Sequence, residues 1–208
     1  MDYSKYIDVA KEIYRDEPSG HDFSHIERVL NFCKEMMKTE NADDFIVTIS
    51  AIFHDVHRVL SSKEGKFISA EEAMPEVENI LNQFDIPKDK LNGILYVIKE
   101  HDNKTTSKSI PIELQIIQDA DILDALGETG LKRTLAYCKK HNIPLTNTNF
   151  DLDCSEYIPD VNPISTLHYI HRTMIPQADM LHTSAAKNIA KDKIKVLCDF
   201  VKHNLNNK

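Results

Sequence analysis

The chain has 208 residues and a formal net charge of −8 at pH 7. Its length suits one compact domain, and 41% hydrophobic with 28% charged residues is typical of a globular protein rather than a disordered or fibrous one. The net negative charge disfavours binding of nucleic acid over a broad surface, because such binding depends on Lys and Arg neutralising phosphates. We therefore expect no strong nucleic-acid binding, while a small anionic substrate stays open if cations gather locally.

The longest apolar stretches, such as residues 46–53, are far shorter than the roughly 20 residues that a membrane span requires. The first five residues contain neither a basic lead nor an apolar run, so they do not predict a secretion signal. The four cysteines are scattered without a close pair, which argues against a zinc finger or a dithiol redox motif and favours a reducing compartment. Together these features predict a cytoplasmic protein without a membrane span.

Apolar residues recur at three- and four-residue intervals along most of the chain, and only five glycines occur. This is the period of the amphipathic helix, so we predict an all-α fold. Caps, prolines and turn residues separate the helices. In chain order, helices are expected over residues 3–14, from 22 or 24 to 37, 43–53, 70–84, 87–101, 111–126, 131–141, 164–174 and 177–204.

The third of these helices contains few polar residues, so we expect it to be buried on most sides. Polar loops are expected over residues 61–69 and 105–109. A longer irregular segment over residues 142–163 contains three prolines and several acids, and long loops of this kind are often functional. We expect one domain over residues 1–208, in which residues 142–208 form this irregular loop and the closing helices.

The adjacent pair His54-Asp55 stands at the end of the apolar third helix. A buried carboxylate without a partner is costly, and a divalent cation compensates by binding carboxylate oxygen and neutral imidazole nitrogen together. His25 on the preceding helix and Asp121 in the helix over 111–126 are further ligand candidates. The alternative is a helix-end histidine and a capping aspartate without a metal.

The ordered set His25, His54-Asp55 and Asp121 resembles the H…HD…D signature of the HD superfamily of metal-dependent phosphohydrolases. Three longer segments, residues 20–29, 118–127 and 165–190, are similar to motifs of one subgroup. The resemblance implies a compact multi-helix HD-domain bundle with additional C-terminal helices. It also implies one divalent metal ion (Mn, Mg, Fe, Co or Ni) held by those two histidines and two aspartates.

The ligand types suit phosphate hydrolysis, because one cation can lower the pKa of bound water and act as a Lewis acid. Ligation by nitrogen and oxygen without thiolate suits a catalytic ion better than a closed structural zinc. The substrates implied by the resemblance are nucleotides and other small phosphorylated metabolites. Asp119 and Asp124, which flank Asp121, are more often capping or supporting acids than ligands.

Catalytic roles are expected for Asp55, His57 and His101. Two departures from the HD pattern leave the general acid unidentified: Ile122 stands where many members have Arg or Lys, and His57-Arg58 where many have an acid. His57 is therefore a candidate proton donor. His101 lies where a histidine of many HD proteins faces the pocket, although it could merely interact with a helix dipole.

Binding of a phosphorylated substrate requires cations. Arg58 and Lys66 follow the metal pair, His21 belongs to the opening motif, and Arg172 lies in a second cationic group near the C-terminus. Each of these residues is also compatible with a plain surface or helix-end role.

Three functions remain open from the sequence. The first is hydrolysis of a nucleotide or another small phosphorylated metabolite by metal-activated water. The second is an iron-dependent HD-like oxygenase, which would be favoured if His57 or His101 ligated a second iron. The third is a non-catalytic ligand-binding HD protein. A homodimer is compatible with all three.

Overall fold

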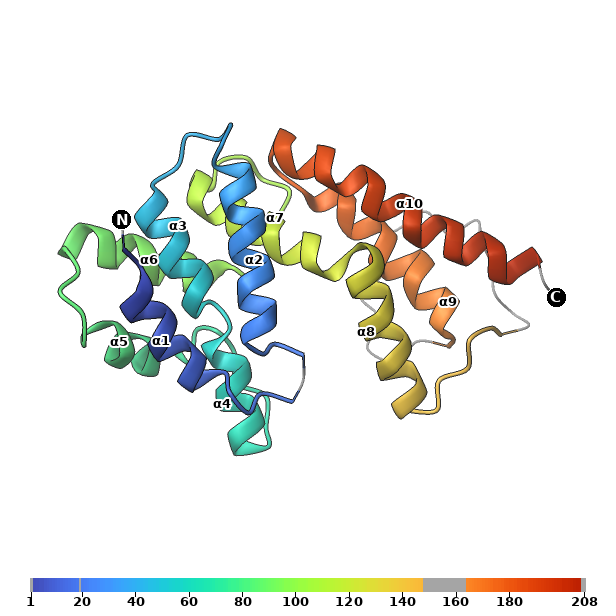
Figure 1. Cartoon of the computed structure of the whole chain (residues 1–208), viewed down its shortest axis with the longest axis horizontal. Coiled ribbons are helices and arrows are strands. Elements are labelled where there is room, and N and C mark those ends of the chain that lie inside the picture. Colours follow the sequence, from blue (N-terminus) through green and yellow to red (C-terminus); the bar gives the residue numbers. More distant parts are fainter. Residues whose placement is uncertain (1, 19, 148–163, 207–208) are drawn as a thin grey trace. The chain divides into compact units, whose positions relative to one another are not determined.

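The computed structural model describes residues 2–18, 20–147 and 164–206 (Figure 1). All regular elements in these ranges are helical, which confirms the all-α prediction. The α-helices are α1 (Ser4–Ile13), α2 (Phe23–Met36), α3 (Asp44–Phe53), α4 (Val56–Glu64), α5 (Met74–Leu81), α6 (Lys88–Glu100), α7 (Ile112–Ala125), α8 (Gly127–Lys140), α9 (Thr166–Tyr169) and α10 (Ser184–Asn206). A π-helix, η1 (Ile170–Met174), and a 3₁₀-helix, η2 (Ile175–Met180), separate α9 from α10.

The chain divides into two compact units, residues 1–120 and residues 121–208, with the division inside α7. We call them unit 1 and unit 2. The expected single domain over residues 1–208 stays a prediction. Within the described ranges, no helix combines the length and the apolar character needed to cross a bilayer.

Helix α3 forms the centre of unit 1, where it contacts α1, α2 and α6 (Figure 1). Each residue of the segment 47–53 is buried, which confirms the prediction that this helix is covered on most sides. Aromatic rings pack around its two ends, with Tyr6 against Phe45 and Phe84, and Phe53 against Phe84. The chain segment that leads into His54 is therefore held rigidly by the apolar core.

Asp43 fixes the start of α3. Its Oδ1 accepts the backbone N–H groups of Phe45 and Ile46, both at 3.1 Å, which is an N-cap. Its other carboxylate oxygen forms an ion pair with Lys90 of α6. The hydrogen bond from Lys90 lowers the pKa of Asp43 below its ordinary 3.8, and partial burial opposes this effect.

Replacing Asp43 with alanine is expected to lower the free energy of unfolding by about 1 kcal/mol at neutral pH, because the first turn of α3 loses its acceptor. Asp43→Asn is the matched control, since an amide oxygen can still cap. The lowered folded pKa means that the stabilisation is present above pH 3.8 and is lost as the pH falls through the folded value. Urea titrations at neutral and acid pH measure both effects, and equal stability of wild type and Asp43→Ala at neutral pH would refute the assignment.

Helix α4 was not expected, and the predicted loop over residues 61–69 is wrong for residues 61–64, which are helical. Val56, His57 and Val59 of α4 are buried, and Ser61 Oγ donates to the His57 carbonyl at 2.8 Å inside the helix. The burial of the apolar face of α4 outweighs its polar local composition. Gly65, with φ of +66°, ends α4 in the left-handed conformation. The next helix, α5, begins at Met74, which is later than the predicted start at residue 70.

In unit 2, α10 contacts α8, η1 and η2, and α8 also contacts α9. Helix α8 begins at Gly127, four residues before the predicted start at residue 131. A Cβ on Gly130 would lie 1.8 Å from the Ala125 carbonyl oxygen, so only glycine lets the chain turn this tightly into α8.

The last predicted helices also differ from the structure. The predicted helix over residues 164–174 changes from α to π geometry at Ile170, and the one over 177–204 begins only at Ser184. α10 begins at this point because Thr183 caps it: the Thr183 Oγ1 accepts the Ala186 N–H at 3.1 Å. Residues 142–147 are not helical, and residues 148–163 of the predicted irregular segment lie outside the described residues.

Candidate metal centre and adjoining pocket

His54 and Asp55 occupy the junction between α3 and α4 in unit 1. α3 ends at Phe53 and α4 begins at Val56, so the pair lies where the chain changes direction within the core. Asp55 has φ −96° and ψ 16°, a sparsely populated backbone region in which many active-site residues lie. Both side chains are almost completely buried, at 1% and 2% exposure. The junction thus places an imidazole and a carboxylate together inside the protein.

His25 joins this pair from the first turn of α2. Asp22 caps that helix by accepting the His25 N–H at 3.2 Å, which agrees with the predicted helix start at residue 22 or 24. His25 is 1% exposed, and its Nε2 lies 3.2 Å from His54 Nε2 and 3.1 Å from Asp55 Oδ2. His54 Nε2 lies 3.4 Å from the same oxygen. Three atoms that commonly bind metals therefore form a compact triangle.

The dimensions of this triangle fit a single cation. Ligand atoms about 2.1 Å from an ion and at right angles to each other are about 3.0 Å apart. The observed separations of 3.1, 3.2 and 3.4 Å are close to that value. Two buried imidazoles and a buried carboxylate at these distances match the ligand types preferred by Mn, Fe, Co and Ni ions.

The imidazole of His54 is oriented for this role. Its Nδ1 donates to the Ala51 carbonyl at 2.9 Å. A carbonyl oxygen only accepts hydrogen bonds, so the ring proton is on Nδ1 and the lone pair of neutral His54 is on Nε2. Metal-binding histidines are commonly fixed in this way by a hydrogen bond from the other ring nitrogen.

The protonation states in the triangle also suit a cation. Burial lowers the pKa of His54, and Asp55 only partly opposes this effect. Burial alone would raise the pKa of Asp55, but His54 and His21 outweigh it and hold that pKa well below its usual range. A neutral imidazole and an ionised carboxylate are the forms that bind metal ions.

The other oxygen of Asp55 faces a second group of histidines. Asp55 Oδ1 lies 3.8 Å from His101 Nε2 and 3.9 Å from His57 Nδ1. Both histidines are 1% exposed, and each Nδ1 donates to the backbone carbonyl three residues earlier, at 2.6 Å for His101 and 3.3 Å for His57. Both rings therefore present Nε2 toward polar neighbours.

Asp102 is the main polar neighbour of this second group. Its Oδ2 lies 3.1 Å from His57 Nε2, and its Oδ1 lies 3.5 Å from His101 Nε2. Burial alone would raise the pKa of Asp102, but His57, His101 and Arg58 lower it. Burial alone would likewise lower the pKa of His101, but the carboxylates of Asp55 and Asp102 raise it. Asp102 is therefore ionised, and His101 keeps its proton to higher pH than an ordinary histidine.

Gln118 holds this region in place. It is fully buried on α7, and its Nε2 donates to the carbonyls of Glu100 and Asn103 at 3.2 and 3.1 Å. The two acceptors stand on either side of His101 and Asp102 in the chain. Gln118 therefore fixes the turn directly after α6, which carries both side chains.

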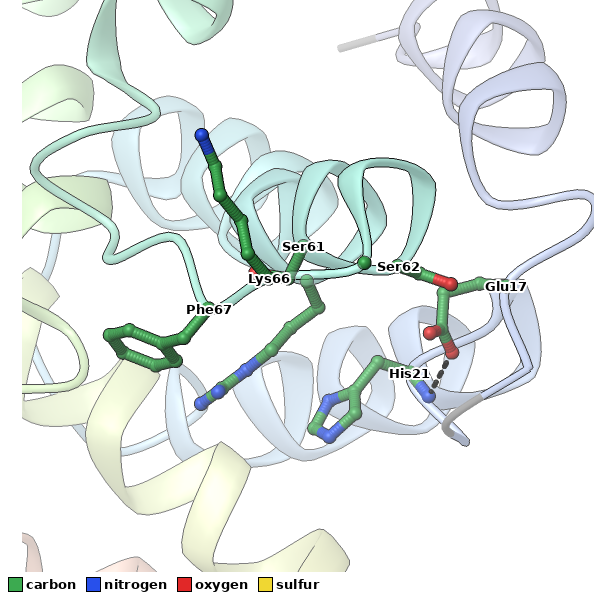
Figure 2. Close-up of a pocket in the computed structure, with 8 residues that line it drawn as sticks. Glu17, His21, Ser61, Ser62, Lys66 and Phe67 are labelled. Carbon is green, nitrogen blue, oxygen red and sulfur yellow. Dashed lines mark hydrogen bonds between the residues drawn. The ribbon is translucent and has the colours of Figure 1, made fainter.

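A pocket of about 450 Å³ adjoins the metal-ligand candidates in unit 1. It is within the usual size range of small-molecule sites, about 300–1,000 Å³. Its walls include Glu17, His21, Arg58, Ser61, Lys66 and Phe67 (Figure 2). Two of these residues lead directly to the triangle, because His21 Nδ1 donates to Asp55 Oδ2 at 2.6 Å and Arg58 Nε lies 3.7 Å from Asp55 Oδ1.

Three of the four predicted substrate-binding residues, His21, Arg58 and Lys66, therefore line one pocket. Their settings differ. The Arg58 guanidinium is held by Asp102, with Nη2 at 3.0 and 3.2 Å from the two carboxylate oxygens. The Lys66 side chain is 67% exposed and pairs with Glu64 at 2.8 Å, so its charge is largely directed at solvent.

Unit 2 holds the remaining predicted residues. Asp121 is its first residue, on α7, and Arg172 belongs to η1, with Nη1 at 3.4 Å from His168 Nε2. Their roles as metal ligand and substrate-binding residue stay predictions from the sequence. Asp124, a weaker ligand candidate, is 1% exposed and accepts a hydrogen bond from Arg133 at 2.9 Å, which indicates a structural ion pair.

Sequence reasoning assigned no role to Glu17, Asp102 or Phe67. Glu17 is buried, and its Oε2 accepts the backbone N–H of His21 at 2.8 Å, which orders the approach to the pocket (Figure 2). Asp102 directly follows His101, and an acid beside a candidate histidine is only a weak sequence signal of a functional residue. Nothing in the local sequence marks Phe67, because its place at the pocket depends on how the chain turns after α4.

Comparison with known proteins places the site in context. A model of the HD domain matches residues 22–126, just over half of the chain. YpgQ of Bacillus subtilis, an uncharacterised protein, is 26% identical over 199 residues, which cover 93% of this chain and 87% of YpgQ. A crystal structure of YpgQ in complex with ADP has a TM-score of 0.70 at 22% identity and covers 99% of this chain and 97% of that one.

Two further solved structures are similar over nearly the whole chain. The Lin1889 protein of Listeria innocua is 30% identical with a TM-score of 0.71, and an HD-superfamily hydrolase of Bacillus thuringiensis is 25% identical with a TM-score of 0.76. Each alignment covers 98% of this chain and 95% of the other. The range that matches the HD domain model, residues 22–126, contains His25, the pair His54-Asp55 and Asp121. The chain therefore belongs to the HD domain family.

Proposed function

We propose that the chain is a metal-dependent phosphohydrolase that acts on a nucleotide or another small phosphorylated metabolite. The observation that carries the proposal is the buried triangle of His25, His54 and Asp55 beside a pocket lined by cationic side chains. Family membership supports it. The complex of YpgQ with ADP supports a phosphorylated ligand.

In this proposal His25, His54 and Asp55 hold one divalent cation, of Mn, Mg, Fe, Co or Ni. The H…HD…D pattern adds Asp121 as the fourth ligand. A cation bound there would lower the pKa of a water molecule and neutralise charge on phosphoryl oxygens. Asp55 also accepts the hydrogen bond from His21, which restricts the orientation of both side chains.

The chain's own cations bind the phosphate. Arg58 offers planar N–H groups that suit phosphoryl oxygens, and Asp102 holds the guanidinium beside the pocket. His21 lies between the pocket and Asp55. Lys66 and Arg172 stay further candidates from the sequence, and Lys66 pairs with Glu64 at the pocket wall.

Proton transfer is assigned to His101 and His57, the two histidines near Asp55 Oδ1. His101, whose pKa the neighbouring carboxylates raise, keeps its proton to higher pH than an ordinary histidine and is suited to protonate a leaving oxygen. His57 is the alternative donor, since its Nε2 is directed at Asp102 at 3.1 Å. Asp102 then serves to hold the protonated imidazole in place.

A substrate screen tests the proposal. Metal-free protein is reconstituted with each of the five metals and incubated with nucleotides and phosphomonoesters, while phosphate and pyrophosphate release are measured. We expect His54→Ala to lower release by about 100-fold or more, because a cation ligand is lost, and His141→Ala, which changes an exposed histidine, to match wild type. Equal release by wild type and His54→Ala would refute the proposal.

An iron-dependent oxygenase is the second candidate. It is favoured by one observation, namely that donor atoms of Asp55, His57 and His101 lie within 4.8 Å of one another. Elemental analysis of the protein reconstituted with iron separates the two candidates. Two irons per chain together with substrate-dependent oxygen consumption would support the oxygenase, and one metal with phosphate release would support the hydrolase.

A further inference from the structure

Phe67 has an unusual setting. It is 74% exposed, more than any other large hydrophobic side chain of the described residues. A single exposed apolar residue is common and needs no explanation. Phe67, however, lines the pocket that contains Arg58 and His21. A bare aromatic ring therefore forms part of a site whose other walls are polar or charged.

The backbone directly after Phe67 is held in place. Gly65 ends α4 in the left-handed conformation and turns the chain back. Ser61 Oγ then accepts the Ile68 N–H at 2.9 Å while it donates to the His57 carbonyl at 2.8 Å. Ile68 is buried. Because Ile68, the residue next to Phe67, is anchored, the position of the ring is restricted, which lowers the cost in conformational entropy of binding a flat ligand.

The pocket has two chemically different ends. In Figure 2 the Phe67 ring lies at one side, and Glu17 with His21 lies at the other. The His21 side leads to the triangle through the 2.6 Å hydrogen bond to Asp55. A ligand that spans the pocket therefore needs an anionic group at the His21 side and an apolar, flat group at the Phe67 side.

A nucleoside phosphate meets both requirements. Its phosphate suits Arg58 and His21, and its base offers a π-face for stacking on a phenyl ring, which every base provides. The hydroxyls of Ser61 and Ser62, which also line the pocket, are suited to contact a sugar between these two groups.

We propose that Phe67 is the stacking platform for the base of a nucleoside phosphate, and that it makes this pocket selective for nucleotides over phosphate compounds without a base. The inference rests on the proposed phosphohydrolase function and narrows its substrate class. Phe67 contacts the base and takes no part in the chemical step.

Equilibrium binding tests the inference independently of turnover. The dissociation constants of adenosine diphosphate and of inorganic pyrophosphate are measured by calorimetry on the metal-reconstituted full chain. We expect Phe67→Ala to weaken binding of adenosine diphosphate about tenfold or more, as for loss of one base-stacking side chain, and Phe67→Trp to retain it. The affinity for pyrophosphate should be the same in wild type and both variants.

Tyr96→Ala is the matched control, because Tyr96 is an exposed aromatic side chain of unit 1 that does not line the pocket. It should bind both ligands as wild type does. The inference is overturned if Phe67→Ala binds adenosine diphosphate as tightly as wild type, if it weakens both ligands equally, or if wild type binds neither. Tight, Phe67-dependent binding without any hydrolysis would instead overturn the proposed function and leave the binding site standing.

Discussion

Replacing Asp55 with asparagine is expected to lower the hydrolysis rate about 1,000-fold or more, because the loss of several kcal/mol of charge stabilisation has this effect on a rate. Asp55 Oδ2 lies within hydrogen-bonding distance of His21 and within 3.4 Å of both His25 and His54. Asparagine keeps the shape and removes the charge. The cation would therefore lose its one anionic ligand in the triangle.

Two measurements on the same samples show whether Asp55→Asn loses activity because it loses bound metal. Elemental analysis should show less bound metal in Asp55→Asn, and steady-state kinetics should show a lower kcat/KM. Circular dichroism checks that the helical fold is retained. Asp85→Asn, which changes an exposed aspartate, is the control and should match wild type in both assays. Full activity of Asp55→Asn with normal metal content would eliminate the proposed centre.

Replacing Arg58 with alanine is expected to lower kcat/KM about 100-fold, since a hydrogen bond to a charged group contributes about 1.5–3 kcal/mol and Arg58 can make two to a phosphate. Arg58→Lys keeps the charge and loses the planar arrangement of donors, so an intermediate loss is expected. Asp102→Asn should also lower kcat/KM, because it weakens the orientation of Arg58 and removes the carboxylate that pairs with His57 and His101.

The kinetic pattern identifies the role of Arg58. If it binds the phosphate in the ground state, Arg58→Ala should raise KM more than it lowers kcat. Arg15→Ala removes an arginine whose side chain is 61% exposed and should leave both constants unchanged. A KM and a kcat for Arg58→Ala that both equal those of wild type would show that the pocket binds phosphate without this residue.

Features that depend on local patterns could be predicted from the amino-acid sequence. The mostly apolar run from Ile46 to Phe53 predicted a buried helix, because a helix with apolar residues on nearly all sides is stable only inside a core. The structure confirms that residues 47–53 are buried. The helix starts predicted at residue 22 or 24 and at residue 43 rested on capping residues, since a cap acts on N–H groups two or three residues ahead. The resemblance to the HD signature pointed to His25, His54 and Asp55, which the structure brings together in unit 1.

Features that depend on residues far apart in the chain could not be predicted and became visible in the folded structure. The helical state of residues 61–64 follows from the burial of Val56 and Val59, which outweighs a polar composition typical of loops. Asp55 contacts two groups of histidines from different helices. Asp102 holds Arg58 of another helix, and Phe67 reaches the pocket from a loop. Local propensity carries no information on such contacts, because they arise from the packing of elements far apart in the chain.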